Sequence, residues 1–104
     1  MSFNTEPTEY VKTALSDLQG GWGNLRDIVV KNFGFPESDK LLFHIDEAMS
    51  WESVRNLKKM ETTLLLIRNI AAQSETPEEV LDLIDDVRGS LEETFEAIAE
   101  GSAE

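Results

Sequence analysis

The chain contains no cysteine, which excludes disulfide bonds, thiolate metal sites and cysteine nucleophiles. This absence fits a reducing compartment, and we expect the protein to be cytoplasmic. The chain also contains only one histidine, His44, which is three residues before Glu47 and shares a helix face with it. Carboxylate-bridged metal bundles need the order Glu-x-x-His twice, so we expect no metal site and no cofactor.

Long apolar runs are also missing, because the longest one covers only residues 64–67. A membrane-spanning helix needs about 20 apolar residues, so we expect no membrane insertion. The first ten residues lack the basic and apolar regions of a signal peptide. The stretch GGWGN lacks the lysine of a phosphate-binding loop, and no nucleophile stands beside an evident general base. These absences argue against an enzyme.

The length and the composition fit one small globular domain. The chain has 104 residues, of which 40% are hydrophobic and 29% are charged. We expect a single helical domain over residues 1–104, with a frayed tail from about residue 100.

Apolar residues recur at helical spacing along most of the chain. The pattern predicts a first helix from Thr5 that ends at Gly20 and Gly21, and a short second helix capped by Asn24. Ser38 can cap a third helix, which either continues past Ser50 or ends there. A long helix follows to about residue 73. A last one runs from Pro77 to about Ala99, and Thr76 and Glu79 can form a capping box at its start. The expected fold is all-α, a small antiparallel bundle of four to five helices.

Two short segments also allow a strand. Residues 29–30 are β-branched, but no partner strand is visible in the sequence. Residues 64–67 can form a buried strand, but helical periodicity on both sides favours a helix.

The long helix carries an apolar seam of the kind found in helical bundles. Its members are spaced by three, four and three residues, and they are Leu57, Met60, Leu64 and Ile67. Leucines beside the seam add apolar surface, so this helix is expected either at the centre of the bundle or at an oligomer interface. The seam is our candidate surface for a homodimer.

Five of the eight aromatic residues lie between residues 22 and 51. Trp22 stands in the glycine-rich GGWG stretch, which we expect to be a flexible link rather than part of a helix. Exposed aromatic side chains often dominate protein interfaces. Trp22, Phe35 and Trp51 are therefore candidate contacts for a partner, with burial in the core as the alternative.

The last predicted helix holds most of the net charge of −12. Residues 75–104 contain eleven acids and one base, Arg88, whereas residues 1–74 contain ten acids and eight bases. A helical projection places one apolar arc from Val80 to Ile98 on the core side. The opposite arc holds the candidate partner-binding acids, which are Asp82, Asp85, Asp86, Glu92, Glu93 and Glu96. Gly89 lies near the middle of this acidic arc.

An acidic arc of this kind has three readings. It can simply solvate a small bundle. It can also be neutralised within the molecule if Lys58 and Lys59 meet the acids near Glu92 across a helical hairpin. The third reading is a docking surface for a basic protein, since a mixture of signs would serve solubility better. Like-charge repulsion disfavours direct binding of nucleic acid or of an anionic membrane.

The sequence thus favours a small acidic, non-enzymatic regulator or inhibitor that binds an electropositive protein surface. A sharper form of this hypothesis is a phage-type inhibitor that imitates nucleic acid and blocks a nucleic-acid-binding site. The alternative is an accessory subunit or assembly factor that apolar helix contacts hold in place.

Overall fold

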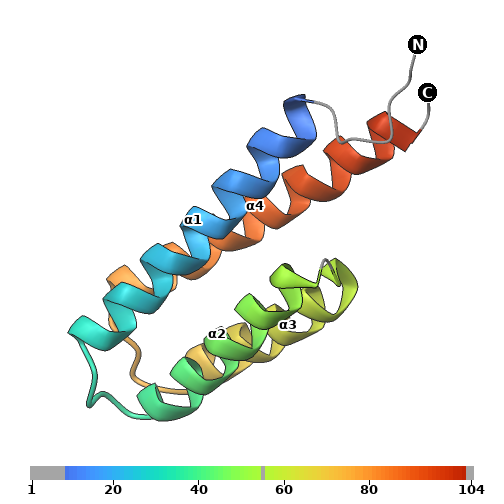
Figure 1. Cartoon of the computed structure of the whole chain (residues 1–104). Coiled ribbons are helices and arrows are strands. Elements are labelled where there is room, and N and C mark those ends of the chain that lie inside the picture. The colour runs from blue at the N-terminus through green and yellow to red at the C-terminus, as the bar shows by residue number, and fades with distance from the viewer. Residues whose placement is uncertain (1–8, 55, 103–104) are drawn as a thin grey trace.

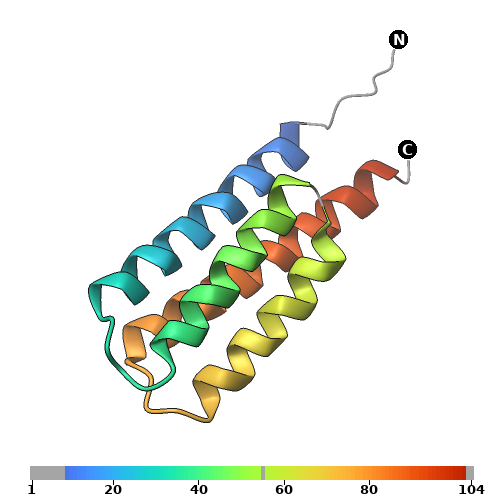
Figure 2. The same cartoon turned by 60° about the horizontal axis from the view of Figure 1, so that its bottom comes forward.

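The computed structural model describes residues 9–54 and 56–102, and these residues form four α-helices. The helices are α1 (Glu9–Lys31), α2 (Ser38–Ser53), α3 (Leu57–Ala72) and α4 (Glu78–Ser102). Successive helices run in opposite directions, as Figure 1 and Figure 2 show. The predicted all-α antiparallel bundle is confirmed.

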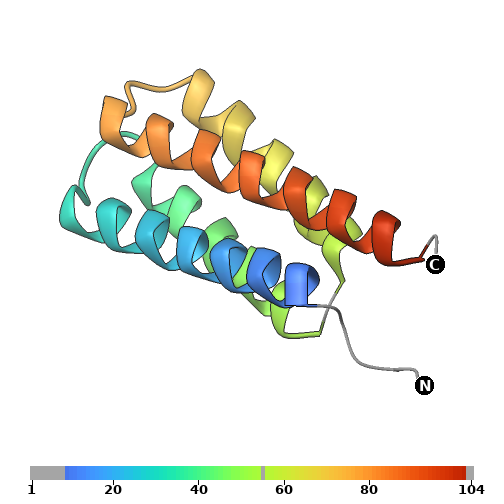
Figure 3. The same cartoon turned by 90° about the horizontal axis from the view of Figure 1, so that it is seen from above.

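The bundle consists of a long pair and a short pair of helices. The long pair is α1 and α4, with 23 and 25 residues, and the short pair is α2 and α3, with 16 residues each. The first turns of α1 and the last turns of α4 therefore extend beyond the short pair (Figure 1), and the molecule is elongated at 53 × 20 × 19 Å. The end of α4 protrudes from the bundle in Figure 3 as well. Among neighbouring helices, α3 and α4 make the weakest contact.

Helix α1 runs without a break through the GGWG stretch, so the predicted stop at Gly20 and Gly21 is wrong, and so is the short helix from Asn24. The reason is a continuous buried stripe at spacings of four, three and four residues, made by Leu18, Trp22, Leu25 and Val29. Three glycines cost a helix about 2–3 kcal/mol in total, whereas burying one tryptophan gains roughly 4–6 kcal/mol. Burial of Trp22 therefore outweighs the local preference of the glycines. The predicted start at Thr5 lies outside the described residues.

The connections between the first three helices are short. Gly34, after α1, has a φ of 116°, which favours glycine. Its N–H donates to Ser38 Oγ at 3.1 Å, and Ser38 is the first residue of α2. The N-cap is Glu37, so the predicted cap at Ser38 is wrong by one residue. The question left open at Ser50 is settled, because α2 continues to Ser53 and α3 is a separate helix. Asn56 caps α3 by accepting a hydrogen bond from the N–H of Lys59 at 3.2 Å.

The start of α4 differs from the predicted capping box. Thr76 donates from its hydroxyl to the carbonyl of Ala71 at 3.0 Å, so it satisfies the end of α3 instead. Over residues 56–102, no hydrogen bond joins Thr76 to Glu79. Helix α4 then continues to Ser102, beyond the expected end near Ala99, and residues 103–104 lie outside the described part.

The core runs the length of the short pair of helices. A main cluster of buried apolar side chains joins all four helices, and a smaller one joins Val11, Ala14 and Ala97 where only α1 and α4 remain. On α4, Val80, Ile84, Val87 and Leu91 are buried as predicted, but Ile98 is 37% exposed. Over the described residues, none of the helices is both long enough and apolar enough to cross a membrane.

Candidate functional site

The acidic residues of α4 lie on its solvent side because the apolar residues between them anchor the opposite side. Val80, Ile84, Val87 and Leu91 are at most 3% exposed, and they fix the rotation of the helix about its axis. All six candidate acids are exposed. We call them the acidic face: Asp82, Asp85, Asp86, Glu92, Glu93 and Glu96.

Within α4, the cation beside the acidic face is Arg88. Its Nη1 donates to Glu92 Oε2 at 3.1 Å, and its Nε lies 4.0 Å from Asp85 Oδ1. Both pairs are exposed and lie within α4, where such pairs contribute only about 0.3–0.5 kcal/mol. Four acids make no ion pair within residues 9–54 and 56–102, and they are Asp82, Asp86, Glu93 and Glu96.

Neutralisation by Lys58 and Lys59 does not occur among the described residues. Lys59 places its ammonium 4.9 Å from the ring centroid of Trp51, which is a cation–π contact on the side of α2. Neither lysine makes an ion pair with Glu92, Glu93 or Glu96 in the described part of the chain. The alternative in which the fold itself neutralises the acidic face is therefore wrong for these two lysines.

Elsewhere on the surface, some charges form local ion pairs. Arg26 on α1 donates from Nε to Asp46 Oδ1 on α2 at 2.7 Å, and Lys40 lies 3.2 Å from Glu37. The Asp46 carboxylate raises the pKa of Arg26, first as a hydrogen-bond acceptor and then through its charge. Among the four helices, α4 has the largest excess of negative charge, with nine acids and one cation.

Trp22 is fully buried, so our expectation that it contacts a partner is wrong. Its Nε1–H donates to Met60 Sδ at 3.2 Å, which ties α1 to α3. Phe35 and Trp51 are half-buried and pack against the main cluster. Their exposed edges remain available, but their larger role is in the core.

The predicted dimer seam lies inside the single chain. Leu57 is 8% exposed, Leu64 is 2% exposed, and Met60 and Ile67 are fully buried. These four side chains fill the centre of the bundle, so a second copy cannot reach them without unfolding the first. Any dimer has to use other residues.

The sequence indicated extra apolar surface beside the seam of the long helix, but it did not indicate an opening between α3 and α4. There Leu65 is 53% exposed, Leu81 is 38% exposed, and Arg68 lies between them without an ion pair over residues 9–54 and 56–102. The signal in the sequence that could have located this side is a second line of residues on the same helix, beside the seam. These residues are spaced by four, three and four, and they are Glu61, Leu65, Arg68 and Ala72.

Gly89 lies on the acidic side of α4, and a methyl group added there meets no atom within 4 Å. We expect Gly89→Ala to raise the free energy of unfolding by about 0.5–1 kcal/mol, because alanine favours the helix. Gly34→Ala is the contrasting variant, since its φ of 116° strains alanine, and it should lower stability. Urea unfolding followed by circular dichroism measures both changes in stability. Equal effects of the two variants would contradict the different backbone conformations that we ascribe to Gly89 and Gly34.

The one histidine of the sequence, His44, lies on α2 beside Glu47. His44 Nδ1 lies 3.0 Å from Glu47 Oε1, one turn apart on α2, and the ring packs edge-on against Phe43. Within the described ranges, three or more metal-ligating side chains do not gather at any point.

The distinctive features of the surface are the acidic face and the apolar side between α3 and α4. Comparison with protein-family models, with curated proteins and with solved structures finds no match to this chain, so its function has to be inferred from these surfaces.

Proposed function

We propose that this chain is a non-enzymatic binding protein that uses the acidic face of α4 to dock on an electropositive surface of another protein, as a regulator or inhibitor. The observation that carries the proposal is the set of four exposed acids without ion pairs, Asp82, Asp86, Glu93 and Glu96. A basic partner gains from such a surface because complementary charge raises the rate of encounter and fixes orientation.

The fold supports this proposal by keeping the acidic face rigid. Helix α4 is anchored along most of its length by buried apolar residues, so its acids keep fixed positions relative to one another. Adjacent acids one turn apart, such as Asp82 and Asp86, repel each other by a few tenths of a kcal/mol. A fold that tolerates this repulsion on a rigid helix presents a surface suited to a basic partner.

A surface that normally binds nucleic acid is the sharper form of the proposed target. Helix α4 spans about 37 Å at ~1.5 Å per residue, and a DNA duplex carries a charge about every 1.7 Å of its axis. The acids of a single α4 are several times sparser than phosphates. One copy of the chain therefore imitates a duplex only in part, and two copies side by side would do so better.

A pull-down from a lysate of the cells that express this chain tests the proposal. The variant carries Asp82→Asn, Asp86→Asn, Glu93→Gln and Glu96→Gln, which removes the four unpaired charges. We expect recovery of the partner to fall by about tenfold or more at low salt, with a smaller difference at high salt because exposed charges are screened.

The matched control has the same change in net charge at exposed acids outside the acidic face, with Asp17→Asn, Asp27→Asn, Asp39→Asn and Glu75→Gln. It should recover the partner as the unmodified chain does. An equal loss of partner recovery in both variants would mean that binding depends on the net charge of the chain and not on the acidic face. Undiminished, salt-insensitive recovery by the first variant would instead favour an accessory subunit held by apolar contacts, for which the exposed Leu65 and Leu81 argue.

A further inference from the structure

One side of the bundle, between α3 and α4, is incompletely closed. These two helices make the weakest contact of the neighbouring pairs, and two pockets of about 370 and 150 Å³ lie between them. Leu65 and Arg68 line both pockets, so the pockets form one elongated depression. We call it the α3/α4 groove, and its other main lining residues are Leu81, Asp85, Arg88 and Phe95.

The walls of the groove are apolar and partly exposed. Leu65 on α3 is 53% exposed and Leu81 on α4 is 38% exposed, with the half-buried Phe95 further along α4. Leaving leucine side chains in water forgoes about 1.5–3 kcal/mol each relative to full burial. Several such side chains along one depression are typical of an interaction surface.

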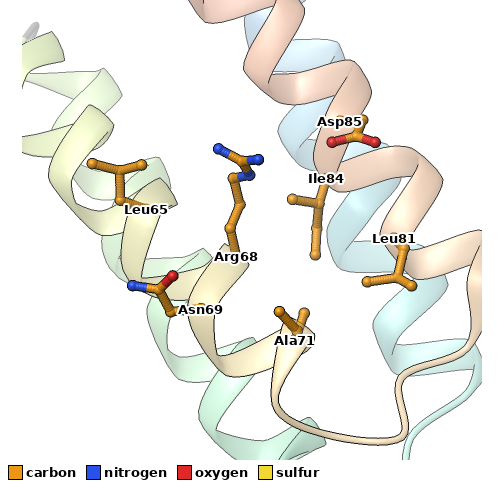
Figure 4. Close-up of a pocket in the computed structure, with 8 residues that line it drawn as sticks. Leu65, Arg68, Asn69, Ala71, Leu81, Ile84 and Asp85 are labelled. Atoms are coloured by element: carbon orange, nitrogen blue, oxygen red, sulfur yellow. The ribbon is translucent and has the colours of Figure 1, made fainter.

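The two walls carry opposite charge. Helix α3 has three cations, Lys58, Lys59 and Arg68, and one acid, whereas α4 has one cation among nine acids. In Figure 4 the Arg68 side chain extends from α3 into the space between the helices, and Asp85 lies on the α4 wall. Arg68 has no ion pair within the described ranges, and Asp85 has only the 4.0 Å contact with Arg88.

Opposite charges on the two walls make the groove self-complementary under one kind of symmetry. A two-fold axis parallel to the helices lays α3 of one copy on α4 of the other, and it keeps every residue at its own height. Arg68 of each copy is then level with Asp85 of the other copy, because the two residues line the same pocket. A two-fold axis across the helices would place α4 on α4, with like charges opposed.

We infer that the α3/α4 groove is the interface of a homodimer whose two-fold axis runs parallel to the helices, with Arg68 of each copy paired to Asp85 of the other. The covered face is small, about 25 Å long and 20 Å wide, from the length of α3 and the width of two helices. An interface of this size is typical of weak complexes, so we expect dissociation in the micromolar range.

Asp82, Asp86, Glu93 and Glu96 line neither pocket, so the dimer leaves these four acids outside the groove. Each dimer would thus present two sets of these four acids, while Asp85 of the acidic face lies in the interface. The groove shares Asp85 and Glu92 with the acidic face, but the inference does not depend on the proposed function, because its test measures self-association and needs no partner protein.

Sedimentation equilibrium at physiological salt, from low micromolar to submillimolar chain concentration, tests the inference. The unmodified chain should change from monomer to dimer over this range. Arg68→Glu alone and Asp85→Arg alone should each weaken the dimer by at least about tenfold, because each sets like charges against each other twice. An equimolar mixture of the two variants should restore association, because in the mixed dimer each of the two pairs joins one positive and one negative side chain.

The matched controls make the same charge changes outside the groove, with Lys40→Glu and Asp82→Arg, and they should leave the association constant within about twofold of that of the unmodified chain. Circular dichroism checks that every variant stays folded, which is expected because all four positions are exposed. An unmodified chain that stays monomeric at every concentration would overturn the inference. The groove would then be a candidate binding site for a helix of another protein. Failure of the mixture to associate, or equal loss in the controls, would overturn it as well.

Discussion

Replacing Trp22 by alanine is expected to lower the free energy of unfolding by about 3–5 kcal/mol. The indole is fully buried at the centre of the main cluster, and its Nε1–H donates to Met60 Sδ at 3.2 Å. Truncation removes the largest buried side chain and leaves a cavity between α1 and α3. A domain of this size has a total stability of about 5–15 kcal/mol, so this one change removes a large share of it. Urea unfolding followed by far-ultraviolet circular dichroism measures the loss.

Trp22→Phe keeps most of the apolar volume and loses only the hydrogen bond and part of the ring, so it should cost roughly 1–2 kcal/mol. It also keeps the experiment informative if the alanine variant fails to fold. Phe43→Ala is the control, because Phe43 is 67% exposed, and its effect should stay within about 0.5 kcal/mol. Similar losses in Trp22→Ala and Phe43→Ala would mean that Trp22 is not a core residue.

The sequence predicted the acidic face and the apolar seam because each depends on the periodicity of a single helix. Leu57, Met60, Leu64 and Ile67 are buried at the heptad spacing that predicted an apolar seam. The acids of α4 are exposed because the buried residues between them repeat at the same period. Burial of such a stripe requires only that some neighbour covers it.

The features that the sequence did not predict depend on which neighbour covers each stripe. The glycines around Trp22 indicate a loop when read locally, and only the packing of Trp22 against Met60 explains why α1 continues. The opening between α3 and α4 likewise depends on the spacing of two helices, which the periodicity of either one leaves undetermined. Leu65 therefore indicated only extra apolar surface beside the seam, and Arg68 looked like an ordinary surface residue.

The last turns of α4 show the same dependence. A straight projection of the helix placed Ile98 in the core, yet Ile98 is 37% exposed and Ala97 is 1% exposed. The short pair of helices does not extend as far as the end of α4, so the apolar neighbours of Ala97 there are Val11 and Ala14 of α1. The buried side of α4 consequently turns toward α1, and a small residue at position 97 permits close packing of the two long helices.

Because the buried side of α4 turns toward α1, an added charge should destabilise the fold much more at residue 97 than at residue 98. Ala97→Asp places a carboxylate against Val11 and Ala14, and it should lower the free energy of unfolding by roughly 2–4 kcal/mol. This loss has an upper limit, because the ends of α1 and α4 can separate and expose the carboxylate to water while the rest of the bundle stays folded. The limit is the free energy needed for that local separation. Ile98→Asp adds the same charge at nearly the same distance from the helix end, and it should cost less than about 1 kcal/mol. Urea unfolding gives both values, and amide hydrogen exchange around Val11 should accelerate in the first variant alone. A greater loss in Ile98→Asp would mean that the straight projection holds to the end of the helix.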